Sequence, residues 1–147
     1  MKIESIPFNE LLGIKRAQAP FILLLEESER LKNHLGTVHA SAQLALAEAT
    51  SGQILISHFG DATDDTLPVV RRVDAKFKAP MRGRIVSRST VTDQTLHSFS
   101  ETLSEKGRAL VSIPVEVLDD SEAIGLLATI EWFAQRHATK ANPRESE

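Results

Sequence analysis

The segment from His39 to Ala49 constrains the fold of this chain more than any other. It is rich in alanine and leucine and contains no glycine, proline or β-branched residue, and this composition strongly favours an α-helix. Thr37 is the expected N-cap, with Gly36 allowing the turn before it, and apolar residues continue the helical spacing to about Phe59. Because the segment is apolar on nearly all sides, we expect this helix to be buried.

The rest of the chain shows mainly the period-two alternation that is typical of strands. A short helical stretch is expected over 6–12, and a helix or an irregular crossover over 92–106. Strands are expected over 21–25, 73–79, 85–91, 109–117 and 124–132. The order is therefore one strand, the long helix and four strands with short connections, which favours an antiparallel sheet. One face of that sheet must cover the apolar helix, which predicts a two-layer α+β domain.

Length and composition narrow the class of protein. The 147 residues fit one domain, which we expect over 1–136, and the polar tail 137–147 is expected to be disordered. There is no cysteine, and the five histidines form no metal-ligand motif, so we expect no metal site. The net charge of −3 gives no reason to expect nucleic acid. Neither a signal peptide nor a membrane-spanning run is present, so a cytoplasmic protein that does not bind membranes is expected.

Charge is distributed unevenly along the chain. Asp61, Asp64 and Asp65 form an acidic loop, and seven of the 17 basic side chains follow within 18 residues, between Arg71 and Arg88. This basic run is either a solvated strand face or a docking surface for a phosphorylated ligand, because Arg and Lys pair well with phosphates.

Glu48 is the residue on which we base the predicted chemistry. It lies among apolar residues of the predicted helix, and burial would raise the pKa of its carboxyl group towards the range that suits a general base. The alternative is that Glu48 points outward into water. The unpaired N–H groups at the helix start, near His39 and Ala40, could polarise a carbonyl. His39 lies nine residues before Glu48, which is roughly 13 Å along the axis, so one subunit alone cannot apply both groups to one carbonyl.

The stretch from Asn33 to Glu48 resembles the signature of hotdog-fold acyl-CoA thioesterases of the phenylacetate-pathway (PaaI-like) type. That family has an Asn, a Gly a few residues on, a His-Gly-Gly that opens the central helix, and an Asp or Glu nine residues after the His. Asn33, Gly36, His39 and Glu48 take those places here. The Phe-Lys-Ala-Pro stretch over 77–80 also resembles the family, and the resemblance covers roughly residues 20–134. One departure is that the family's His-Gly-Gly reads His-Ala-Ser here.

The resemblance implies a hotdog fold, in which an antiparallel sheet wraps around a long central helix. It implies that Glu48 activates water or attacks the thioester, and that the Ala40 N–H belongs to an oxyanion hole. Asn33 would orient the water or the thioester, and His39 would support the turn. His39 also has the simpler interpretation of a helix-start residue satisfied by backbone.

The resemblance also implies a homodimer with the active site at the subunit interface, possible stacking into a tetramer, and no cofactor apart from the CoA thioester that is the substrate. The expected substrate-binding residues are Gly36, Thr66, Lys78, Arg82 and Arg84. Ala40 in place of glycine adds a methyl group where the thioester would approach, so altered or absent activity is the alternative.

Three functions are compatible with these features to different degrees. The first is hydrolysis of an acyl-CoA or related acyl thioester, and the second is a non-catalytic hotdog module that binds acyl-CoA or fatty acyl ligands. The third is a hotdog dehydratase or hydratase, which would need a catalytic His. The chain has no His-Phe-Pro motif, since His58 and Phe59 are followed by Gly60, and this disfavours the third function.

Overall fold

The computed structural model describes residues 1–60 and 65–137. The elements in chain order are η1 (Ile3–Ser5), α1 (Pro7–Leu12), β1 (Lys15–Arg16), β2 (Leu23–Leu25), η2 (Glu29–Leu31), α2 (Ala40–Phe59), β3 (Thr66–Phe77), β4 (Ile85–Arg88), α3 (Asp93–Lys106), β5 (Arg108–Asp119) and β6 (Ile124–Arg136). The predicted tail over 138–147, and Asp61 and Asp64 of the predicted acidic loop, lie outside the described residues.

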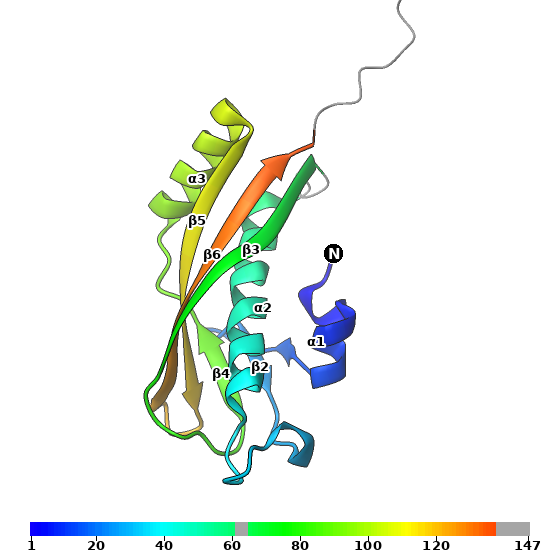
Figure 1. The fold of residues 1–147 in the computed structure, drawn as a ribbon, viewed down its shortest axis with the longest axis vertical. Helices are drawn as coiled ribbons and strands as arrows, with labels where there is room; N and C mark the ends of the chain where they lie inside the picture. Colours follow the sequence, from blue (N-terminus) through cyan, green and yellow to red (C-terminus); the bar gives the residue numbers. More distant parts are fainter. Residues whose placement is uncertain (61–64, 138–147) are drawn as a thin grey trace, which may run out of the picture.

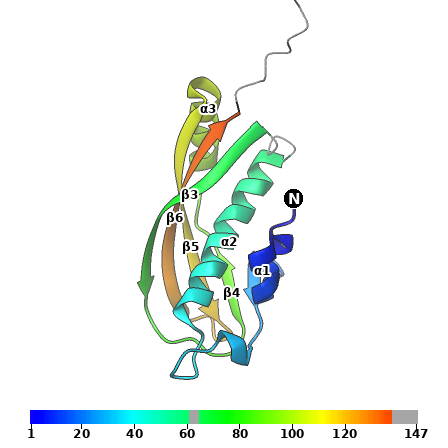
Figure 2. The same ribbon diagram turned by 45° about the vertical axis from the view of Figure 1, so that its right-hand side comes forward.

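The strands of the described chain form one six-stranded antiparallel sheet in the order β1-β2-β4-β5-β6-β3. The sheet curves around α2, which runs along its inner face (Figure 1). From a second viewpoint, α2 lies between the sheet and the N-terminal segment that contains α1 (Figure 2). A sheet wrapped around one long helix is the hotdog architecture, so the expected α+β fold class is confirmed.

Helix α2 is buried along most of its length. Its buried residues include Leu46, Ala47, Ala49 and Leu55, each at most 1% exposed. The small alanine side chains let the helix axis approach the sheet, while the leucines fill the remaining volume. The predicted extension of this helix to Phe59 is confirmed.

The predicted N-cap of α2 was wrong. His39 is the N-cap, and its Nδ1 accepts a hydrogen bond from the Ser41 amide at 2.9 Å. Residues before it are held in extended pairing, because the Val38 amide donates to the Met81 carbonyl and the His39 amide donates to the Leu31 carbonyl. The helix therefore cannot begin at Thr37.

The other elements follow the predicted pattern with shifted ends. The uncertain segment 92–106 is a helix, α3, capped by Thr92. Strand β4 ends at Arg88 and not near 91, because the Ser89 hydroxyl binds both the Pro114 carbonyl and the Val91 amide. Strand β1 was not predicted: it is two exposed basic residues that pair with β2, and they carry no hydrophobic alternation.

Strand β3 is the far edge of the sheet and begins earlier than predicted, at Thr66. It pairs with β6 in the register Val70↔Trp132 and Val73↔Ile130. On its inner side, Val70, Val73 and Phe77 are 36%, 45% and 47% exposed, because α2 does not reach across to this edge. Within the described chain, β3 is thus an unpaired edge strand whose inner side is apolar and partly exposed, while Arg71, Arg72, Asp74 and Lys76 lie between these apolar residues in the sequence.

Candidate active site at the central helix

Glu48 is half-buried on α2. Its carboxylate forms no hydrogen bond or ion pair with any residue that the structure describes, and burial alone raises the pKa of this carboxyl group. No cation in the described chain offsets this effect, so the shift is in the direction that favours proton uptake by the carboxylate.

The start of α2 supplies the second group of the predicted site. Because Ala40 is the first helical residue, its N–H has no partner inside the helix, and it donates to no other group in the described chain. Ala40 and the neighbouring His39 are both exposed. Ala40 and Glu48 are eight residues apart on one helix, or about 12 Å along its axis. The structure therefore does not bring these two predicted groups together within one protomer.

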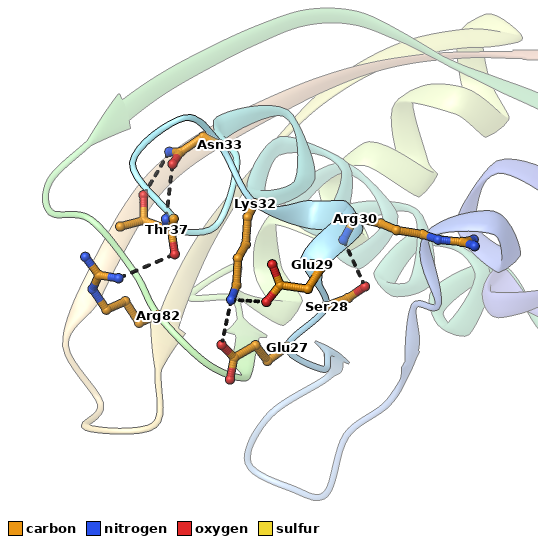
Figure 3. Close-up of polar contacts among 9 residues, drawn as sticks. Glu27, Ser28, Glu29, Arg30, Lys32, Asn33, Thr37 and Arg82 are labelled. Atoms are coloured by element: carbon orange, nitrogen blue, oxygen red, sulfur yellow. Dashed lines mark hydrogen bonds and ion pairs between the residues drawn. The ribbon is translucent and has the colours of Figure 1, made fainter.

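The loop before α2 is held by Asn33 (Figure 3). The Asn33 Nδ2 donates to Thr37 Oγ1 at 2.8 Å, and its Oδ1 accepts from the amides of Leu35 and Thr37. Gly36 sits at the tip with a φ of 72°, a conformation that side-chain-bearing residues rarely adopt. Asn33 thus shapes the loop that leads into the helix start, whatever contact it makes with a substrate.

The predicted phosphate-binding side chains fall into two groups. Arg82 lies beside the same loop and donates to the Gly36 carbonyl at 3.4 Å (Figure 3). Lys78 is exposed and makes no ion pair within the described chain. Arg84 is bound to Glu26 at 2.9 Å, and Arg88 is bound to Glu116. Arg82 and Lys78 therefore form no ion pair within the described chain, unlike Arg84 and Arg88.

Thr66 lies far along the chain from this loop and is only 7% exposed, at the start of β3. It lines a cavity of about 160 Å³ at the C-terminal half of α2, together with residues of the N-terminal segment and with Trp132. Trp132 Nε1 donates to Ser51 Oγ at 2.9 Å, and Ser51 Oγ donates to the Glu48 carbonyl at 2.7 Å. Gly52 and Ser51 were not predicted as site residues, although a glycine that interrupts an alanine-rich helix is a signal of close packing.

Two other kinds of site are absent from the described residues. No group of three or more His, Asp or Glu side chains among them is arranged to hold a metal ion. None of the helices in residues 1–60 and 65–137 is long and apolar enough to cross a bilayer.

Residues 20–134 match the family described as a domain of unknown function, DUF4442, and the chain belongs to that family. No curated protein matches the sequence.

Several solved bacterial structures share the fold. A Pseudomonas aeruginosa protein of unknown function, named a probable thioesterase, has a TM-score of 0.80 at 19% identity, over 92% of this chain and 91% of that chain. A Bacillus halodurans protein solved with CoA has a TM-score of 0.66 at 17% identity, over 86% of this chain and 74% of that chain. A mutant thioesterase from Pseudomonas aeruginosa has a TM-score of 0.67 at 16% identity, over 91% and 89% of the two chains. At these identities the likeness establishes the hotdog fold.

Proposed function

We propose that this protein is a thioesterase of the PaaI-like type, which hydrolyses an acyl-CoA or a related acyl thioester in the cytoplasm. The observation that carries this proposal is Glu48: a half-buried carboxylate with a raised pKa and no cation beside it in the described chain. Solved structures of the same fold that are named thioesterases, and one solved with CoA, support the choice of reaction.

The proposed reaction uses Glu48 as a general base. The carboxylate takes a proton from a water molecule as the water oxygen attacks the thioester carbonyl carbon. The resulting oxyanion accepts hydrogen bonds from the backbone at a helix start, where the Ala40 N–H lies. The C–S bond then breaks, and the proton passes from Glu48 to the departing CoA sulfur. The products are a carboxylic acid and free CoA thiol, so atoms and charges balance.

A second subunit completes this site in our proposal. The helix start and Glu48 of one protomer are about 12 Å apart, so Glu48 would act with Ala40 of the partner subunit. The unpaired edge of β3 and the exposed Val70, Val73 and Phe77 favour pairing of two protomers there, since exposed apolar edges rarely persist in monomers. Stacking of two such dimers into a tetramer would leave this arrangement intact.

The CoA portion would bind at the helix start. Lys78 and Arg82 would contact its phosphates there, and Arg84 would contribute after exchanging its partner Glu26 for a phosphate. Gly36 would lie beside the bound CoA phosphates, because the Arg82 side chain contacts the Gly36 carbonyl.

The test is the steady-state hydrolysis of a panel of acyl-CoAs by the wild type and by Glu48→Gln. We expect Glu48→Gln to lower kcat by at least about a hundredfold, which is the usual contribution of a general base. Glu105→Gln, an exposed change on α3, is the matched control and should leave the rate unchanged. Equal rates for the wild type and Glu48→Gln would refute the assignment.

A second experiment separates the two roles of Glu48. In a single turnover carried out in water enriched in heavy oxygen, label in the Glu48 carboxylate would identify Glu48 as the nucleophile, because water has then attacked the Glu48 carbonyl of a mixed anhydride. A general base would leave the label only in the product acid.

The second candidate is a non-catalytic module that binds acyl-CoA. The exposed Ala40 favours it, because its methyl group stands where the family has glycine. Acyl-CoA that stays bound and intact through long incubation would select this function. Ala40→Gly would then be expected to create or increase turnover.

A further inference from the structure

An apolar cavity of about 160 Å³ lies between the N-terminal segment, the second half of α2 and the β3–β6 pair. Ile3 and Ile6 form its cover, and its walls include Gly52, Phe59, Thr66 and Trp132. None of these side chains is charged. A pocket of this composition suits a hydrocarbon group and excludes a phosphate or a nucleotide.

The cavity begins about one helical turn beyond the proposed catalytic acid, which is not one of its lining residues. Gly52 follows Glu48 by four residues on α2, so the two positions lie on one face, with about 5–6 Å between their Cβ sites. Trp132, which forms a wall, is tied through Ser51 to the Glu48 carbonyl. A thioester carbonyl held at Glu48 would thus lie about one helical turn from the cavity, within reach of an acyl group.

Two residues limit the size of the cavity. A Cβ atom at Gly52 would lie 3.2 Å from Ile3 Cδ1 and 3.6 Å from Trp132 Cζ2. Any side chain at position 52 therefore projects between the cover and the wall. Ile3 closes the cavity from the other side and is only 4% exposed.

We propose that this cavity receives the acyl group of the substrate and selects groups of about six carbons, with Gly52 and Ile3 as specificity-determining residues; the inference rests on the proposed thioesterase function. The size follows from the volume, because apolar cavities of about 150 Å³ bind a benzene molecule. A hexanoyl group fits this limit, and so does the six-carbon ring of a phenylacetyl group, whereas a dodecanoyl chain exceeds it.

The test compares kcat/KM for acetyl-, hexanoyl-, phenylacetyl-, octanoyl- and dodecanoyl-CoA. We expect the wild type to favour hexanoyl-CoA or phenylacetyl-CoA. The better substrate of these two shows whether the cavity prefers a linear or an aromatic acyl group. Gly52→Ala should lower the hexanoyl-to-acetyl ratio by roughly tenfold, which is the discrimination that one methylene group produces in an apolar pocket. Ile3→Ala should shift the preference in the opposite direction, towards octanoyl-CoA.

Two further variants control this experiment. Leu11→Ala removes an exposed side chain of α1, 77% exposed, from the same N-terminal region and should leave the profile unchanged. The double variant Ile3→Ala/Gly52→Ala should return the profile towards that of the wild type. A Gly52→Ala protein that melts like the wild type and keeps the wild-type profile would overturn the proposal, as would parallel losses on all substrates.

Binding of the free acids tests the cavity independently of catalysis. Trp132 is the only tryptophan of the chain, so its fluorescence reports on the cavity wall. Hexanoate or phenylacetate should change this fluorescence saturably, and Gly52→Ala should weaken the binding by roughly tenfold. If no acyl-CoA is hydrolysed but one of the acids changes the Trp132 fluorescence saturably, the proposed thioesterase function is refuted and the cavity is still an acyl-binding site. If acyl-CoAs are hydrolysed but neither acid perturbs Trp132, the pocket assignment fails alone.

Discussion

Replacement of Gly125 by alanine should destabilise the protein strongly, although it adds one methyl group. Gly125 is buried near the start of β6, and a Cβ atom there would lie 2.2 Å from Met81 Sδ and 2.3 Å from Met81 Cγ. Met81 is 1% exposed, so its side chain can move aside only by repacking against other buried residues. The added methyl group must therefore displace a packed side chain or the backbone of β6.

The expected loss of stability follows from the usual cost of overpacking a core, about 1–3 kcal/mol. A urea m-value of about 2 kcal/mol/M converts a cost of about 2 kcal/mol into a midpoint shift of about 1 M. Met81→Ala alone should cost about 2–5 kcal/mol, because it leaves a cavity. In the double variant, the methyl group added at position 125 partly fills that cavity. The cost of the double variant should then fall short of the sum of the two single costs by at least about 1 kcal/mol.

The assay is urea unfolding followed by circular dichroism at one fixed protein concentration, since association would otherwise shift the midpoint. The four proteins of the double-mutant cycle are compared under the same conditions. A local consequence is also expected: the Met81 carbonyl accepts from the Val38 amide, so the strain should reach the loop before α2. A Gly125→Ala midpoint equal to that of the wild type would refute the reasoning, and so would a cost that persists undiminished in the Met81→Ala background.

Three further predictions concern α2 and its surroundings. Burial raises the pKa of Glu48, so the native state binds a proton at this carboxyl group more tightly than the unfolded state does. The stability that protonated Glu48 contributes is therefore complete below the ordinary glutamate pKa, and it is lost as the pH rises through the raised pKa. Glu48→Gln should therefore increase the melting temperature at pH 7–8 but not near pH 4, and calorimetry showing an equal gain at both pH values would contradict this. His39→Ala removes the N-cap acceptor and should cost about 1 kcal/mol in urea unfolding, with His39→Asn restoring most of it; an unchanged midpoint would argue against the cap. Ser87→Ala leaves the buried amide of Leu23 without its Ser87 Oγ acceptor and should cost about 1–3 kcal/mol, whereas the exposed Ser121→Ala should cost less in the same assay.

The central part of the fold could be predicted because local composition decides it. Alanine and leucine over 39–49 favour a helix in any surroundings, and the strict alternation over 109–117 favours a strand in the same way. Strand β1 could not be predicted, since its Lys15 and Arg16 pair with β2 without any hydrophobic pattern. The cap of α2 was misassigned because Thr37 is the better local cap, and only the contacts of Asn33 show that its hydroxyl is already engaged.

The candidate site likewise has one part that the sequence predicts and one part that only the tertiary structure shows. Glu48 stands out in the sequence as one acid within an apolar helix, and its half-buried position agrees with that interpretation. The roles assigned to the site residues all stay predictions: Glu48, Asn33, His39, Ala40, Gly36, Thr66, Lys78, Arg82 and Arg84. The cavity beside Gly52 could not be read from the chain, because its cover, floor and walls come from segments that are separated by up to about 130 residues.

The sequence by itself determined the helix, the alternating strands and the position of Glu48 within the apolar helix, because each depends on residues that are neighbours along the chain. Only the tertiary structure decided which side of α2 is left open, which edge of the sheet stays unpaired, and that Ile3 and Trp132 meet across Gly52. These features depend on distances between segments remote in sequence, and close packing, not local propensity, sets those distances.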